Sequence, residues 1–150
     1  SAGRWFSMAL DSNGNVYTWG DNSFKQLGYA TSPAYNHVPT MPFTNTAIDI
    51  ACNQSTAFAL IDSLNMLAWG SNSYGELANC SVSSNDSYPI NATVFPSAVA
   101  KLVAQSSMDH SSAILKNGKI VSWGFDLLAN NFGNCNGVNS CSYIYPDSTG

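Results

Sequence analysis

The chain has 150 residues, of which 45% are hydrophobic and only 9% are charged, and its formal net charge is −4. This length and apolar content suit a single folded domain, 1–150, and no apolar run approaches the roughly 20 residues of a membrane-spanning helix, so we expect no membrane insertion. The 5 lysine and arginine residues are too few for the basic surface that nucleic-acid binding needs, which excludes nucleic acid as a partner.

A β-hairpin is predicted at the start of each third of the chain. Two apolar segments are separated each time by a short polar stretch, such as Asp11-Ser-Asn-Gly-Asn15 in the first third. Asn-Gly between apolar segments is typical of a type I′ turn, because that turn needs positive φ at both central residues. The paired segments are 6–10 with 16–19, 56–61 with 66–69, and 110–115 with 119–123.

A Trp-Gly pair ends each hairpin and marks a repeat. The three pairs, Trp19-Gly20, Trp69-Gly70 and Trp123-Gly124, follow one another at spacings of 50 and 54 residues, and a polar turn comes after each of them. We expect the three indoles to be buried at equivalent sites between neighbouring units, because an aromatic ring supplies a large apolar surface.

A variable loop and a strand complete the repeat. A proline segment follows each loop, around Pro39, Pro89 and Pro146. Strands close the first two repeats at 47–51 and 98–104, whereas the third lacks a closing strand. No window has a sustained helical period of about 3.6 residues. The sequence therefore predicts an all-β fold of four-stranded antiparallel propeller blades, with repeats at approximately 2–51, 52–104 and 105–150.

These repeats resemble the regulator of chromosome condensation repeat, a tandem-repeat β-propeller family. The segments that match its pattern best are Ala2-Gly3, 16–22, Gln26-Leu27-Gly28, 69–77 and 117–124. The chain departs from the pattern where Phe6 and Thr56 replace the usual histidine and where Cys52 replaces the usual glycine. The resemblance implies a closed propeller, typically of seven blades, so three blades would be an incomplete propeller or part of a larger one.

Three blades alone would leave an uncovered blade face at each end. The chain begins at Ser1 without methionine, and we interpret it as a processed product or a piece of something longer. The partners expected at the open faces are further blades of the same polypeptide or copies of the chain, and a repeated head-to-tail contact gives a ring or a filament. Trp5 lies outside the repeat register, so we expect it to be the exposed tryptophan at the open end. Together with Phe6 it is the predicted assembly contact.

Four Asn-x-Ser/Thr sequons are candidate sites for N-linked glycans. Asn79, Asn85 and Asn91 lie in one polar stretch that we interpret as an exposed loop, 79–93, whereas Asn53 lies beside a predicted buried strand. With 17 asparagines and 22 serines, amides, hydroxyls and sugars would supply the solubility that few charges provide here. The composition favours an extracellular or cell-surface glycoprotein, with a cytosolic Asn/Ser-rich protein as the alternative.

The four cysteines form an even set, which an oxidising compartment would pair. Cys135 and Cys141 enclose a short polar loop and are predicted to form a disulfide, which leaves Cys52 to pair with Cys80. Sequence alone allows three connectivities, and four free buried thiols are the alternative. A zinc site is disfavoured because there is no Cys-x-x-Cys and no histidine nearby.

No catalytic or metal-binding constellation is visible in the sequence. His37 and His110 are the only histidines, and we interpret them as structural residues of a loop and a core strand. Glu76 is the only glutamate, so a paired-carboxylate mechanism would depend on scattered aspartates. The stretch Asp11–Asn15 differs from a calcium loop in the place of its glycine and in lacking the closing glutamate. We therefore predict no enzyme activity and no cofactor.

Two functional hypotheses follow. The main one is a non-enzymatic structural or interaction module of an extracellular glycoprotein, self-assembling or part of a larger propeller, and able to form fibrils. The alternative is an intracellular protein-binding propeller such as an exchange factor for a small GTPase, an activity that the family resemblance implies as one option.

Overall fold

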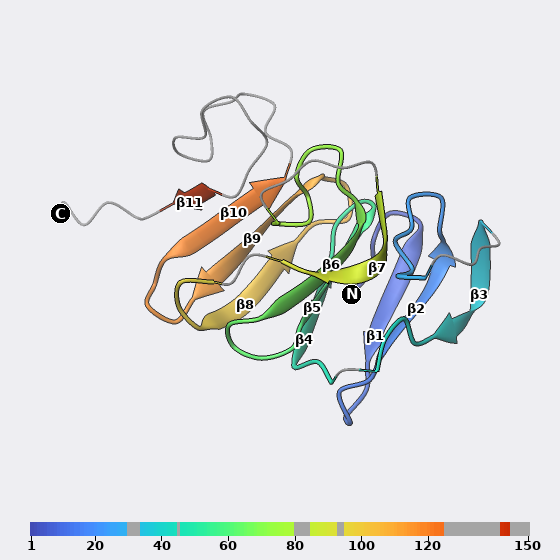
Figure 1. Cartoon of the computed structure of the whole chain (residues 1–150), viewed down its shortest axis with the longest axis horizontal. Coiled ribbons are helices and arrows are strands. Elements are labelled where there is room, and N and C mark those ends of the chain that lie inside the picture. Colours follow the sequence, from blue (N-terminus) through green and yellow to red (C-terminus); the bar gives the residue numbers. More distant parts are fainter. Residues whose placement is uncertain (30–33, 45, 80–84, 93–94, 125–141, 145–150) are drawn as a thin grey trace.

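The computed structural model describes residues 1–29, 34–44, 46–79, 85–92, 95–124 and 142–144. Within these ranges the chain forms three antiparallel sheets that lie side by side as successive blades (Figure 1). The first blade has the strand order β1 (Phe6–Leu10), β2 (Val16–Asp21) and β3 (Tyr35–Thr40). The second has β4 (Asp49–Cys52), β5 (Thr56–Leu60), β6 (Met66–Ser71) and β7 (Asn85–Asn91). The third has β8 (Val99–Ala104), β9 (His110–Leu115), β10 (Ile120–Gly124) and β11 (Ser142–Ile144).

The all-β fold and the three hairpins are confirmed, but the neighbours of two strands differ from the prediction. The strands predicted to close the first two repeats are β4 and β8, and each pairs with the hairpin that follows it. Each is therefore the inner strand of the next blade. In the first blade the bridge between Ala2 and Ser7 stands at the corresponding inner position.

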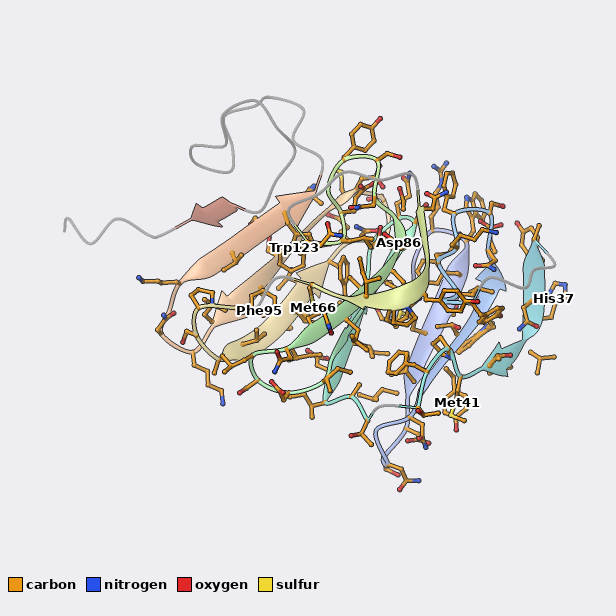
Figure 2. All side chains as sticks on the ribbon, in the orientation of Figure 1. His37, Met41, Met66, Asp86, Phe95 and Trp123 are labelled. Atoms are coloured by element: carbon orange, nitrogen blue, oxygen red, sulfur yellow. The ribbon has the colours of Figure 1, made fainter. Side chains whose placement is uncertain are left out.

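The outer strands β3 and β7 contain two of the proline segments that the sequence did not assign to a strand. Pro39 and Pro89 lie inside these strands, where the pairing with β2 and β6 shifts register. An outer strand tolerates proline because one of its edges needs no ladder hydrogen bond. His37 also lies on β3 and is exposed at the outer edge of the first blade, not in a loop (Figure 2).

Asparagine and aspartate side chains stabilise the hairpin turns. The Asp11 carboxylate accepts hydrogen bonds from the backbone amides of Asn13 and Asn15 at 2.8 and 2.9 Å. Asp62 accepts from Leu64 and Asn65 in the same way in the second blade. The carboxylate of Asp11, in the stretch compared above with a calcium loop, is thus hydrogen-bonded within the turn. This supports the interpretation of the stretch as a hairpin turn.

The glycine of each Trp-Gly pair is required by the backbone. Gly20, Gly70 and Gly124 have φ of 112°, 107° and 100°, a region that side-chain-bearing residues rarely adopt. A Cβ at these positions would also collide with a backbone carbonyl oxygen, that of Trp5, Ser55 or Asp109 respectively. Both constraints recur in all three blades, which explains why the pair marks the repeat.

The core consists of two apolar layers, one between each pair of blades. The first layer packs Phe6, Met8, Val16 and Leu27 against Ala57, Ala59 and Trp69. The second packs Phe58, Leu60, Met66, Leu77 and Phe95 against Ala113, Val121 and Trp123. The middle blade therefore contributes one sheet face to each layer, whereas the first and third blades each contribute one face to one layer.

Two of the three repeat tryptophans are buried as predicted. Trp69 is 0% exposed and Trp123 is 1% exposed. The Trp123 ring meets Phe58 edge-on at 5.6 Å. It lies 6.1 Å from the ring of Phe95, and both Trp123 and Phe95 are labelled in Figure 2. Trp19 is only half-buried, so the prediction of equal burial is wrong for this residue. The reason is that no described sheet packs on the face of β1 and β2 that carries it.

Candidate functional site

The loops that precede the first hairpin strand of each blade meet at one end of the sheets. These inner loops comprise residues 3–5, 53–55 and 105–109. Backbone hydrogen bonds join them across the blades, because the amide of Arg4 donates to the Gln54 carbonyl and the amide of Gln54 donates to the Met108 carbonyl, both at 3.2 Å. Residues that lie about fifty positions apart in the chain are thereby held at fixed positions relative to one another.

A polar hollow of about 420 Å³ opens between these inner loops. Its lining residues are Gly3, Arg4, Gln54, Ser106 and Ser107, so all three blades contribute to it. No carboxylate and no large apolar side chain belongs to this lining. The hollow is thus suited to polar ligand groups and not to an apolar small molecule.

Trp5 stands beside the hollow and is 63% exposed, which confirms the expectation that it is the exposed tryptophan. The Arg4 guanidinium carbon lies 5.5 Å from the centroid of its ring, within cation–π range. Phe6 is only 3% exposed and packs in the layer between the first two blades. Its prediction as an assembly contact is therefore wrong, whereas the assembly role of Trp5 stays a prediction.

The polar turns after β2 and β6 end on the same side of the blades as the inner loops, because β1 starts where β2 ends. Asn22 and Asn72 each accept a hydrogen bond from the amide of the leucine five residues later. The turns present Phe24 and Tyr74, which are 47% and 41% exposed. Trp5 and Met108 of the inner loops are exposed at the same end of the blades, and we call the surface formed by the hollow and these four side chains the loop face.

A buried pair of hydrogen-bonded polar side chains supports each of these two turns. The carboxylate is the first residue of the pair in the first blade and the second residue in the second blade. In the first blade the Gln26 amide donates to Asp21 at 2.7 Å and its oxygen accepts from the Phe24 amide at 2.8 Å. In the second blade the Ser71 hydroxyl donates to Glu76 at 2.9 Å. Burial raises the pKa of Glu76, and hydrogen bonds from the Tyr74 amide and Ser71 oppose that rise.

A family model described as the Regulator of chromosome condensation (RCC1) repeat matches residues 1–26. The chain is 29% identical over 126 residues to the mitochondrial RCC1 domain-containing protein RUG3 of Arabidopsis thaliana, covering 83% of the chain and 28% of that protein. It is 26% identical over 140 residues to Protein pim1 of Schizosaccharomyces pombe, covering 82% of the chain and 26% of that protein. The chain therefore spans about a quarter of the length of these relatives.

Solved propellers contain the same arrangement of blades. A crystal structure of human WBSCR16 superposes with a TM-score of 0.77 at 20% identity, covering 95% of this chain and 38% of that one. Yeast RCC1 (Prp20) bound to Kap60 also gives 0.77, at 19% identity, covering 95% and 36%. This chain is thus similar to the RCC1 repeat family in both sequence and fold. Its sheets are about three blades of an RCC1-like propeller.

One position of the RCC1-type pattern has to be reassigned. The amide of Asn53 donates to the Thr56 carbonyl just as the amide of Gly3 donates to the Phe6 carbonyl, both at 3.0 Å. Asn53, and not Cys52, therefore stands where the pattern has glycine. The Asn53 side chain is 0% exposed, accepts from the Thr56 amide at 2.8 Å and donates to Ser111. This burial leaves no room for the glycan that the sequon suggested.

The other sequons differ in their accessibility. Asn85 and Asn91 are the end residues of β7, so the predicted exposed loop 79–93 contains a strand. Asn91 is exposed, whereas Asn79 and Asn85 are half-buried. Glycans at these three asparagines stay a prediction, with Asn91 the most accessible of them.

Cys52 is a free, buried thiol, so the predicted bridge to Cys80 is not formed in this structure. The Cys52 sulfur lies 3.1 Å from the Ser1 hydroxyl, and burial raises the pKa of its thiol. Cys80, Cys135 and Cys141 lie outside the described residues. The Cys135–Cys141 disulfide therefore stays a prediction.

The described ranges contain no group of three or more histidine, cysteine, aspartate or glutamate side chains that could hold a metal ion. His37 stacks on Tyr35 at 6.3 Å on the outer strand, while His110 is half-buried at the start of β9. No helix of sufficient length and apolarity to cross a membrane occurs in this part of the chain.

Proposed function

We propose that this chain is a non-catalytic, protein-binding part of an RCC1-type propeller and that the loop face is its binding surface. The observation that carries the proposal is the set of exposed side chains on one face, namely Trp5, Phe24, Tyr74 and Met108 beside Arg4. Tryptophan, tyrosine, phenylalanine, methionine and arginine are the residue types enriched where proteins bind one another. Equivalent loops of successive blades supply them, so a partner can contact several blades at once.

The similar proteins favour this alternative over an extracellular, fibril-forming module. Yeast RCC1 (Prp20) has been crystallised bound to Kap60, and the structure of Prp20p is described with its binding to Gsp1p and histones. These partners belong to those proteins, and they support protein binding as the role of the module here. Nucleotide exchange on a small GTPase is the narrower form of the proposal.

Further blades of the same polypeptide, and not copies of this chain, are the proposed cover for the open blade faces. Ser112 and Ser122 pair across β9 and β10 with their hydroxyls 2.7 Å apart. The equivalent pair in the second blade is Phe58 and Ala68, and Phe58 packs on Trp123. A head-to-tail copy would place this serine pair against Trp19, without the large apolar side chain that Phe58 provides against Trp123 and Met8 provides in the first layer.

The experiment compares partner capture by the native polypeptide and by variants of the loop face. Trp5→Ala, Phe24→Ala and Tyr74→Ala are each expected to lower the recovery of specific partners at least tenfold in quantitative mass spectrometry of affinity eluates. Tyr88→Ala is the matched control, because Tyr88 is 61% exposed but lies on the outer strand β7.

Nucleotide release from Gsp1p is measured with the same variants to test the exchange-factor form. Capture that is unchanged in all three loop-face variants, or lost equally in the Tyr88 control, contradicts the proposal.

A further inference from the structure

The polar hollow between the inner loops carries a positive charge and several hydrogen-bond donors. Arg4 contributes a guanidinium group with donors only, Gln54 an amide, and Ser106 and Ser107 hydroxyls that are able to donate. Gly3 has no side chain and leaves space beside them. A ligand group that accepts several hydrogen bonds and carries a negative charge is the best match for this set of donors.

The Arg4 side chain is available for such a ligand. Within the described part of the chain its guanidinium makes no ion pair, and its ring contact with Trp5 holds it beside the hollow. The backbone of its loop is tied to Gln54, and Gln54 is tied to Met108. Because the donors are already held in place, a ligand loses less conformational freedom in binding them.

The nearby carboxylates do not cancel this preference. Asp21 and Glu76 in the polar turns are 5% and 1% exposed and are hydrogen-bonded within their own turns. Asp109 is the last residue of the third inner loop and is half-buried. Burial raises the pKa of its carboxyl, and the charges of Arg4 and His110 lower it. Asp109 weakens the attraction for a small free anion, so additional contacts with the ligand are needed.

We propose that the hollow is a carboxylate subsite that receives an aspartate or glutamate side chain from an acidic segment of the protein partner. The inference rests on the proposed function and names the chemistry that the loop face recognises. The carboxylate bonds to Arg4, Gln54 and the serine hydroxyls, while the apolar part of the segment lies on Trp5 and Met108. The guanidinium supplies two parallel donors to a carboxylate, which a lysine in the same place cannot do.

The test uses the native polypeptide and two synthetic peptides, blocked at both ends, in which glutamate or glutamine alternates with glycine and serine. Backbone amide shifts of Arg4, Gln54, Ser106 and Ser107 are followed by NMR during titration. The glutamate peptide is expected to give saturable shifts that weaken as salt is added, and the glutamine peptide is expected to bind at least tenfold more weakly. Sodium acetate serves as a free carboxylate and is expected to bind more weakly than the glutamate peptide.

Two variants keep the proposal falsifiable. Arg4→Gln should lower the affinity for the glutamate peptide at least tenfold, and Ser107→Ala should lower it severalfold. Lys116→Gln, in a hairpin turn at the opposite end of the blades, is the control and should leave this affinity unchanged. Equal binding of the two peptides, or no loss in Arg4→Gln, overturns the carboxylate subsite. If partner capture still depends on Trp5 while Arg4→Gln has no effect, this inference fails and the proposed function stands.

Discussion

The indole nitrogens of Trp69 and Trp123 occupy equivalent positions but have different surroundings. The Trp69 Nε1 donates to the buried Gln26 carbonyl at 3.0 Å, whereas the buried Trp123 Nε1 has no hydrogen-bond partner among the described residues. Replacing each tryptophan by phenylalanine removes a similar ring volume, at a cost of about 1 kcal/mol. Any further difference in the free energy of unfolding between the two variants is then due to the hydrogen bond of Trp69.

The expected magnitudes follow from this difference. Trp69→Phe also leaves the Gln26 carbonyl without its donor, which adds about 1–3 kcal/mol, so the total loss is about 2–4 kcal/mol. Trp123→Phe removes an unsatisfied buried donor, and the relief of its desolvation cost offsets the lost volume. The free energy of unfolding should therefore change little, and the two variants should differ by at least about 2 kcal/mol.

Chemical denaturation of the native polypeptide, with hydrogen exchange of the β5–β6 and β9–β10 amides, measures both effects. Trp19→Phe is the control for a half-buried indole and should cost less than about 1 kcal/mol. An equal loss in Trp69→Phe and Trp123→Phe would refute the hydrogen-bond argument.

Three further predictions concern the backbone and the buried or hydrogen-bonded carboxyls. Gly70→Ala should destabilise the fold by about 3 kcal/mol or more, because φ is 107° and the Cβ meets backbone, while Gly118→Ala, with open space around it, should cost only about 1 kcal/mol in the same denaturation assay. Burial raises the pKa of Glu76 above 4.5, so the folded chain holds this proton more tightly and stability falls as pH rises from 4.5 through the folded-state value. Glu76→Gln, which can reproduce the bonds of Gln26, should flatten that part of the Tm–pH curve and raise the Tm at pH 7; an unchanged curve contradicts this. The Asn65 side chain holds the pKa of Asp62 below 3.8, so its stabilisation is lost as pH falls below 3.8, and Asp62→Asn should make the acid limb of the Tm–pH curve shallower.

The hairpins and the repeat could be predicted from the sequence because they depend on local hydrogen bonds and backbone constraints of the turns. Asp11 and Asp62 bond to amides two to four residues away, and the glycine after each tryptophan meets a backbone constraint of its own blade. These preferences depend on a few neighbouring residues and hold wherever the blade is placed. The order of hairpin, Trp-Gly pair and polar turn was therefore available from residue types alone.

Features that depend on another blade could not be obtained in this way. Trp19 and Trp69 have the same local sequence setting, yet only Trp69 has a described blade packed over it. The strands at Pro39 and Pro89 exist because β2 and β6 offer them a shifted register, which outweighs the weak strand preference of proline.

The sequence by itself determined the repeating hairpins, the tryptophan spacing and the exposure of Trp5, because these follow from short-range backbone preferences and the repeat register. Only the tertiary structure decided that Phe6 and Asn53 are buried, and that Arg4, Gln54 and Ser107 line one hollow. The physical reason is that burial and the shape of a site depend on which surfaces the packing of blades brings together, and residues about fifty positions apart carry no local signal of that contact.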